Sequence, residues 1–254
     1  LPIDSLSLRL RLSGGRLALS PLHATVAGGK VTAHMRLAAV QGATPPAGHL
    51  EMSIADVRLG PVLEKLDLGG AGTGSLHGYV AFDPAGASVA GILSSADGGL
   101  RLSMAGGTLD ALLVELAGLD LGESLLHWLG KPRVFPVRCA LIQASARDGV
   151  LDLAGSTLDT SDTRFTMGGQ VRFPAERLAL RIEAHPKDPS LFAARTPLLI
   201  EGRFRNPNFH PLWAGLAGRA AAAGALALVA PPAAMLAFVE PGLGESGPCG
   251  RPGD

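Results

Sequence analysis

Histidines and carboxylates are the residues of this chain that could bind a metal ion or move a proton. No two of the seven histidines share the i, i+4 spacing with which one helix face presents two ligands to zinc. Asp152, Asp159 and Asp162 lack the alternating ligands and central glycine of a calcium loop. The sequence therefore predicts turn and surface positions for these groups, and no metal site. The histidines are His23, His34, His49, His77, His127, His185 and His210.

Two short motifs could contact a phosphate group. The glycine-rich residues 70–74 would cradle a phosphate only between a strand and a helix, but a strand is predicted from Ser75 onward, which favours a hairpin entry. Lys187 could reach a phospholipid headgroup, although Asp188 and Ser190 beside it favour a capped turn. GxSxG, HExxH and P-loop motifs are absent. We therefore expect no catalytic residue, no cofactor and no enzymatic activity.

The strongest pattern is an alternation of leucine with polar residues. Leucine occupies every second position from Leu6 to Leu12, and after the turn residues 13–15 the alternation resumes at Leu17 and Leu19. Successive side chains of a strand point to opposite faces, so this pattern predicts strands with one apolar and one polar face. Such a sheet must cover its apolar face with protein or with lipid, and alternation alone does not decide between them.

Turn signals divide the chain into short strands and helices. Glycine-rich or Asp-Gly turns are expected at 13–15, 28–29, 96–99, 106–107 and 148–149, with another turn at 174–176. The short connections predict an antiparallel meander. Helices are expected at 60–66, 88–93 and 110–129. The expected strands are 5–12, 16–20, 30–38, 48–57, 72–83, 99–105, 135–147, 149–159, 163–173, 177–184 and 197–205.

The region after residue 210 differs in composition from the strands. Residues 220–238 are alanine-rich and uncharged, which is long enough for a membrane span. Pro231 and Pro232 interrupt this run, and alanine is only weakly apolar, so two short helices on the sheet end or in a membrane interface are favoured. We therefore divide the chain into a β domain at 1–210 with a helical insertion near 110–129, a helical segment at 211–240, and a flexible tail at 241–254.

Composition excludes some partners and leaves the cysteines open. The 254 residues include 22 basic and 22 acidic ones, without charge blocks, and aromatic residues make up 4%. This composition weighs against nucleic-acid binding. Cys139 and Cys249 do not form a CxxC motif, and they are either free thiols or a disulfide. Because the chain begins at Leu1, we interpret it as a fragment or a mature portion.

Short motifs follow one another in a fixed order along the chain. They are 97–98, 106–110, 136–140, 147–150, 158–163, 168–169, 176–180, 186–188, 195–198, 241–244 and Cys249. This ordered series resembles the C-terminal region of AsmA-family proteins, which are relatives of TamB. The resemblance is strongest at 98–205, and Arg203–Phe204–Arg205 departs from it, because the family has small or hydroxyl residues there.

The resemblance implies a fold, a location and a function. AsmA-like proteins are envelope proteins of Gram-negative bacteria, tethered to the inner membrane by an N-terminal helix that this fragment lacks, with their bulk in the periplasm. They look like lipid carriers in which a long curved antiparallel sheet, with few helices, forms a groove that shields phospholipid acyl chains between the inner and outer membranes. We expect the same here, with membrane components as partners and membrane-surface contact through 211–240. In an oxidising periplasm, a Cys139–Cys249 disulfide would tie the tail to the sheet.

The candidate lipid-binding residues are the apolar residues of the best alternating strands. Flexible aliphatic side chains suit a sliding acyl chain, because a non-directional apolar surface does not trap it. The alternative is a structural module for outer-membrane protein assembly, in which the chain's own helices cover this face. The candidates are Leu6, Leu8, Leu10, Leu12, Leu17, Leu19, Leu100, Leu102, Met104, Leu178, Leu180 and Ile182.

Overall fold

Fifteen strands and two short helices make up the described part of the chain. The computed structural model describes residues 2–38, 46–65, 70, 72–86, 88–110, 134–161, 163–187 and 197–211. The helices are α1 (Leu59–Glu64) and α2 (Val89–Ser94). The strands are β1 (Ile3–Ser13), β2 (Arg16–Val26), β3 (Gly29–Ala38), β4 (Ala47–Arg58), β5 (Gly72–Thr73), β6 (Ser75–Asp83), β7 (Asp97–Ala105), β8 (Thr108–Asp110), β9 (Val134–Arg147), β10 (Val150–Asp152), β11 (Ser156–Thr160), β12 (Thr163–Arg172), β13 (Arg177–Pro186), β14 (Leu198–Arg203) and β15 (Asn206–Pro211).

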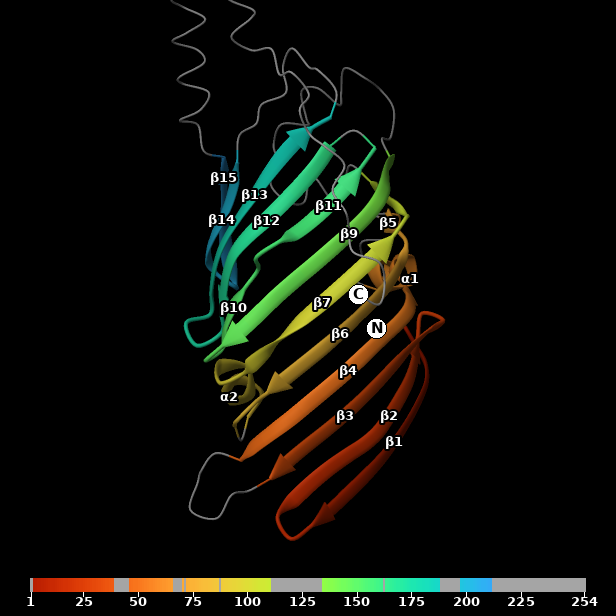
Figure 1. Cartoon of the computed structure of the whole chain (residues 1–254), viewed down its shortest axis with the longest axis vertical. Coiled ribbons are helices and arrows are strands. Elements are labelled where there is room, and N and C mark those ends of the chain that lie inside the picture. The colour runs from red at the N-terminus through yellow and green to blue at the C-terminus, as the bar shows by residue number, and fades with distance from the viewer. Residues whose placement is uncertain are drawn as a thin grey trace, which may run out of the picture.

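All of these strands belong to one antiparallel sheet. Its order is β1-β2-β3-β4-β6-β7-β9-β10-β12-β13-β14-β15, with β11 beside β9 and β12, and with β8 joining β5 to β9 (Figure 1). Strands that follow each other in sequence are therefore mostly neighbours in space, as the short turns predict. The predicted fold class, a mainly β chain with one long antiparallel sheet and few short helices, is confirmed.

Several predicted boundaries are wrong in detail. The turn expected at 96–99 is instead the start of β7, where Gly98 lies so close to β6 that a Cβ would be 2.2 Å from the Ala81 carbonyl oxygen. Strand 72–83 is divided into β5 and β6, strand 149–159 into β10 and β11, and strand 197–205 is a hairpin of β14 and β15. Strand β2 continues to Val26 through the cis Ser20–Pro21 bond, which a periodicity of two does not reveal.

The two short helices lie at opposite ends of the central strands (Figure 1). Helix α1 follows β4, and α2 lies between β6 and β7, where the Ser88 hydroxyl accepts a hydrogen bond from the Gly91 N–H and caps the helix. The predicted helical insertion at 110–129 and the helical segment at 211–240 lie outside the described residues, except that residues 110 and 211 belong to β8 and β15. The tail at 241–254 also lies outside them.

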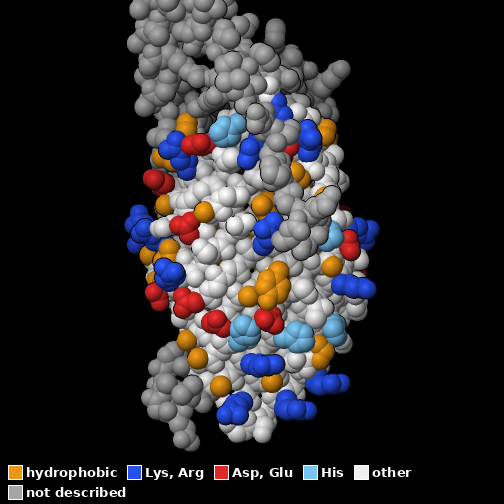
Figure 2. All heavy atoms as spheres, in the orientation of Figure 1, with side chains coloured by type: hydrophobic (Ala, Val, Ile, Leu, Met, Phe, Trp, Pro, Cys, Tyr) orange, Lys and Arg blue, Asp and Glu red, His pale blue; other side chains and the backbone are white. Residues whose placement is uncertain are grey.

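The sheet is curved, and its edge strands recede from the viewer in Figure 1. Histidine and charged side chains are spread over the face toward the viewer (Figure 2). Because such side chains alternate with apolar ones along each strand, the apolar side chains point to the opposite, concave face. Only 11 hydrophobic residues in the described part of the chain are buried, and 5 of them are alanine or methionine. The apolar face is thus not the inside of a densely packed core.

We expect Gly169→Ala to destabilise the sheet strongly. Gly169 has φ +120°, and a Cβ there would lie 2.2 Å from the Ala179 carbonyl oxygen of β13. Backbone strain and overpacking together should cost about 2–4 kcal/mol, measured by denaturant unfolding. Gly14→Ala is the matched control, because its φ is +55° and no atom lies within 4 Å of its Cβ position. It should cost about 1 kcal/mol, and equal losses in the two variants would contradict the close approach.

Candidate functional site

The strand register aligns apolar residues in continuous rows across the sheet. Residues that are direct partners in neighbouring antiparallel strands lie on the same face. Starting from Leu8 in β1, the partners are aliphatic in each successive strand as far as β9, so one row crosses seven strands. That row is Leu8, Leu22, Ala33, Met52, Val80, Leu100 and Ala144.

The same face continues through the second half of the sheet. Ala146 in β9 is the partner of Leu151 in β10, and this connection carries the face on to β12 and β13. A further row reaches the last strand, β15, through one glycine, two aliphatic residues and one phenylalanine. That row is Gly169, Leu180, Ile200 and Phe209. The apolar face therefore extends from one edge strand to the other in the described part of the chain.

All twelve candidate lipid-binding residues lie on this apolar face. The four leucines of β1 are the most accessible, with exposed fractions of 51% to 72%. The candidates in β2, β7 and β13 are half-buried, apart from Met104. Met104 is 5% exposed because its side chain packs against Gly74, so it offers little surface to a ligand.

The apolar face also contains residues that the sequence reasoning did not select. Most of them alternate with polar residues in their strands, so the signal was present but weaker than in the leucine run of β1. Ile142 is 39% exposed and Phe209 39% exposed. The additional residues include Leu22, Val31, Met35, Leu37, Leu50, Met52, Ile54, Val80, Phe82, Ile142, Leu151, Leu158, Phe165, Met167, Val171, Leu198, Ile200 and Phe209.

The opposite, convex face is polar. Charged and histidine side chains are spread over it, and hydrophobic side chains are scattered among them (Figure 2). Every histidine in the described residues lies on this face, as expected for surface positions, whereas His127 is outside them. The contrast between the two faces shows that the alternation is maintained across the whole sheet, not only in β1.

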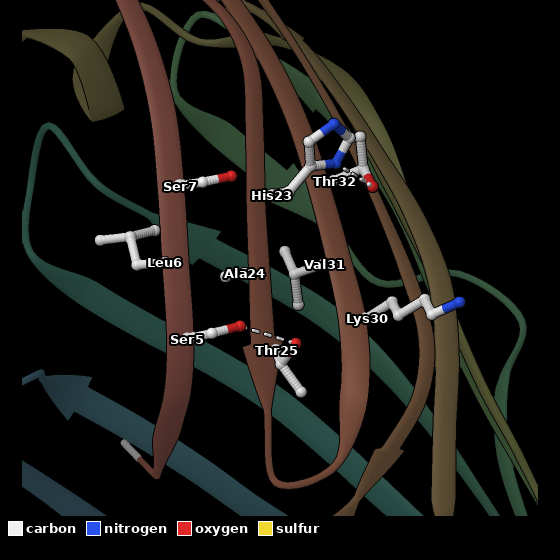
Figure 3. A pocket seen from close by; sticks show the side chains of 9 residues that line it. All are labelled: Ser5, Leu6, Ser7, His23, Ala24, Thr25, Lys30, Val31 and Thr32. Atoms are coloured by element: carbon white, nitrogen blue, oxygen red, sulfur yellow. Dashed lines mark hydrogen bonds between the residues drawn. The ribbon is translucent and has the colours of Figure 1, made fainter.

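A hollow of about 410 Å³ lies over the first three strands (Figure 3). Ser5 and Ser7 point to one side of β1 and Leu6 to the other, so the close-up shows the alternation directly. The Ser5 hydroxyl donates to Thr25 at 2.9 Å. The His23 Nδ1 atom lies 3.4 Å from the Thr32 hydroxyl oxygen. The hydroxyl groups on this side satisfy one another, which is typical of a solvated polar face.

His49 lies between two carboxylates on the polar face. Its Nδ1 is 2.6 Å from Asp83 Oδ1, and its Nε2 is 3.2 Å from Glu51 Oε1. Only the imidazolium form donates from both nitrogens. Hydrogen bonds to Asp83 and then to Glu51 raise the pKa of His49 above its ordinary 6.5. Hydrogen bonds with His49 and then with Tyr79 lower the pKa of Glu51 below its ordinary 4.5.

These shifts predict a pH window for local stability. A raised histidine pKa contributes stability that is complete below 6.5 and is lost as the pH rises through the folded-state value. The lowered pKa of Glu51 contributes stability above 4.5 that is lost as the pH falls through its folded-state value. The difference in unfolding midpoint between the native chain and His49→Gln should therefore be largest between pH 4.5 and pH 6.5. It should shrink as the pH rises through the raised pKa of His49. A difference independent of pH would contradict the charged His49.

Lys187 is paired within the protein. Its Nζ lies 2.6 Å from Asp159 Oδ1 and donates to the Thr160 carbonyl oxygen at 2.5 Å. The Lys187 side chain is 12% exposed and the Asp159 side chain 2%. Arg138 lies on the other side, with its Nε 3.7 Å from Asp159 Oδ2. A lysine neutralised in this way is a structural cation, so the headgroup contact considered from the sequence is not supported, and the sequence reasoning missed its partner Asp159.

The remaining chemical candidates are the glycine-rich segment, the cysteines and the possible metal ligands. Residues 72–73 form β5 and are followed by β6, so the glycine-rich segment leads into a strand as expected, but β5 pairs with β8 and forms no hairpin with β6. Cys139 is disulfide-bonded, whereas Cys249 lies outside the described residues, so their pairing stays a prediction. Among the residues that the structure describes, no three His, Cys, Asp or Glu side chains are placed to hold a metal ion. No helix in the same set is long and apolar enough to cross a membrane.

Comparison with known proteins identifies the family. The model of the AsmA family matches residues 1–154. The AsmA family protein YhjG of Escherichia coli (strain K12) is 30% identical over 250 residues, which cover 98% of this chain and 36% of that protein. The chain thus spans about a third of the length of this relative. No solved structure matches. With a matching family model over more than half of its length, the chain belongs to the AsmA family.

Proposed function

We propose that this chain is a periplasmic segment of an AsmA-family envelope protein whose apolar face shields phospholipid acyl chains between the inner and outer membranes. The observation that carries the proposal is the continuity of the apolar face from β1 to β15. Folded soluble proteins rarely expose a contiguous apolar surface of this kind unless something binds it.

The chemistry of the face suits an acyl chain. The rows contain mainly Leu, Ile, Val, Met and Ala, which contact a hydrocarbon without directional preference. Covering a fully exposed leucine stabilises by about 1.5–3 kcal/mol. Because Leu6, Leu8, Leu10 and Leu12 are more than half exposed, a ligand that covers them gains about 1 kcal/mol from each. The charged residues of the opposite face keep that side in water.

The place of the chain in the cell is part of the same proposal. Membership of the AsmA family supports a role in the bacterial envelope, with tethering to the inner membrane and support of outer-membrane biogenesis. Contact of residues 211–240 with a membrane surface remains a separate expectation.

The test is to purify the chain from cells and to identify bound phospholipids by mass spectrometry. We expect stoichiometric phospholipid, released by organic extraction. A chain that is folded and free of lipid would overturn the proposal. If protein segments were then found against the apolar face, the chain would instead be a structural module for outer-membrane protein assembly.

A further inference from the structure

Five arginines lie in or beside three neighbouring turns at one end of the strands. The turns join β9 to β10, β12 to β13, and β14 to β15 (Figure 1). The Phe173 N–H donates to the Gly149 carbonyl oxygen at 3.1 Å, and the Phe204 N–H donates to the Glu176 carbonyl oxygen at 2.9 Å. These bonds hold the turns together. We name the following residues the arginine rim: Arg147, Arg172, Arg177, Arg203 and Arg205.

Three residues of the arginine rim are direct cross-strand partners. Arg172 pairs with Arg177, and Arg177 pairs with Arg203, so three guanidinium groups follow one another on the polar face. Directly opposed side chains in neighbouring strands have Cβ atoms about 4.5–5.5 Å apart, and like charges in this position destabilise the pair. The strand pairing does not stabilise such a row, whereas a bound anion would compensate its charge.

The carboxylates of the described residues do not supply that anion. No ion pair in the described part of the chain reaches any arginine of the rim. Arg172 donates to the Gln170 amide oxygen, which is neutral. Of the nearby carboxylates, Glu201 lies 3.6 Å from His210, and Asp152 accepts from Gln170. Asp148 and Glu176 lie in the same turns as the arginine rim, but neither forms an ion pair with it among the described residues. All five arginines are exposed.

An aromatic pair stands beside the arginine rim. The rings of Phe173 and Phe204 are 5.9 Å apart in an edge-to-face arrangement, and Phe204 is 37% exposed. Exposed aromatic residues next to arginines are typical of surfaces that rest at the level of lipid headgroups. An acidic protein would satisfy the arginines, but it would not require the exposed ring.

We propose that the arginine rim docks this chain onto a bilayer of anionic phospholipids, with the guanidinium groups on the lipid phosphates and Phe204 at the interface. Guanidinium forks bind phosphate oxygens in pairs, which a row of three can repeat on adjacent headgroups. The proposal goes beyond the shielding of acyl chains by the apolar face, because it assigns a membrane contact to the polar face at these three turns. It also gives a role to the segment 203–205, which departs from the family pattern.

The test is co-sedimentation of the full chain with phosphatidylcholine vesicles that contain or lack phosphatidylglycerol. We expect binding only when phosphatidylglycerol is present, and about thirtyfold weaker binding for R177Q/R203Q, since each arginine near an anionic surface contributes about fivefold. R177K/R203K should recover part of the binding. Removing two like charges should leave the circular dichroism spectrum unchanged.

The matched control is R16Q/R36Q, which removes the same charge from two exposed arginines that have no ion pair within the described residues. It should weaken vesicle binding less than threefold. Equal losses in both double variants would overturn the proposal in favour of diffuse attraction, and absence of both vesicle binding and phosphate binding would overturn it in favour of an acidic protein partner. Saturable binding of inorganic phosphate without vesicle binding would assign the rim to free phosphate. Loss of vesicle binding with retained co-purified lipid would separate docking from acyl-chain shielding.

Discussion

Replacing Leu10 and Leu12 by aspartate should lower the phospholipid bound by this chain at least tenfold. Leu10 is 56% and Leu12 72% exposed, so neither replacement opens a packed core. Each change removes an apolar contact and places a carboxylate where an acyl chain would lie. Loss of burial alone amounts to about 1 kcal/mol or more per leucine, and two such losses exceed the 1.4 kcal/mol that corresponds to tenfold. The measurement is phospholipid per mole of purified protein, by mass spectrometry.

The control for this prediction lies on the same strand. Ser7 and Ser13 point to the polar face of β1, and S7D/S13D adds the same two charges there. This variant should bind as much phospholipid as the native chain. Equal lipid in L10D/L12D and the native chain, with both folded, would show that the β1 leucines do not contact lipid.

The second large effect should come from the buried ion pair. Lys187→Met removes the partner that lies 2.6 Å from the Asp159 carboxylate, whose side chain is 2% exposed, and leaves only the more distant and exposed Arg138 at 3.7 Å. Removing one member of a buried pair costs about 3–5 kcal/mol, because the remaining charge stays desolvated. The measurement is the free energy of unfolding in denaturant at neutral pH.

An exposed ion pair provides the comparison. Arg181 and Glu183 lie 2.6 Å apart, but their side chains are 52% and 39% exposed. Arg181→Met should cost less than about 1 kcal/mol, because water screens such pairs. If Lys187→Met were as mild as Arg181→Met, the Asp159 site would be hydrated and the pair would not hold β11 against the end of β13.

The sequence determines the faces of this sheet better than it determines its strand ends. Alternation is a local property of each strand, so Leu6 to Leu12 already predict one apolar face, and the register then aligns them with Leu17, Leu19 and Leu22. The break between β10 and β11 depends on how both strands pair with β9 and β12, which the alternation within a single strand does not reveal. The hairpin of β14 and β15 was missed because Phe204 and Arg205 are not typical turn residues.

Contacts between distant residues explain what the sequence did not reveal about the sites. Asp159 and Lys187 are separated by a whole hairpin, and Asp159 by itself has the composition of a turn residue. The arginine row likewise exists only through the register of β12, β13 and β14. Curvature is also absent from a period-two pattern, since flat and curved sheets share the same alternation.

The most direct measurement is photocrosslinking to phospholipid in intact cells. A benzophenone amino acid would replace Leu8, Leu100 or Leu180 on the apolar face, and Ser7, Arg101 or Arg181 at neighbouring positions on the polar face. If the apolar face shields acyl chains, the first three positions crosslink to phospholipid and the second three do not. Equal crosslinking on both faces, or crosslinking of the apolar positions to protein alone, would contradict the account.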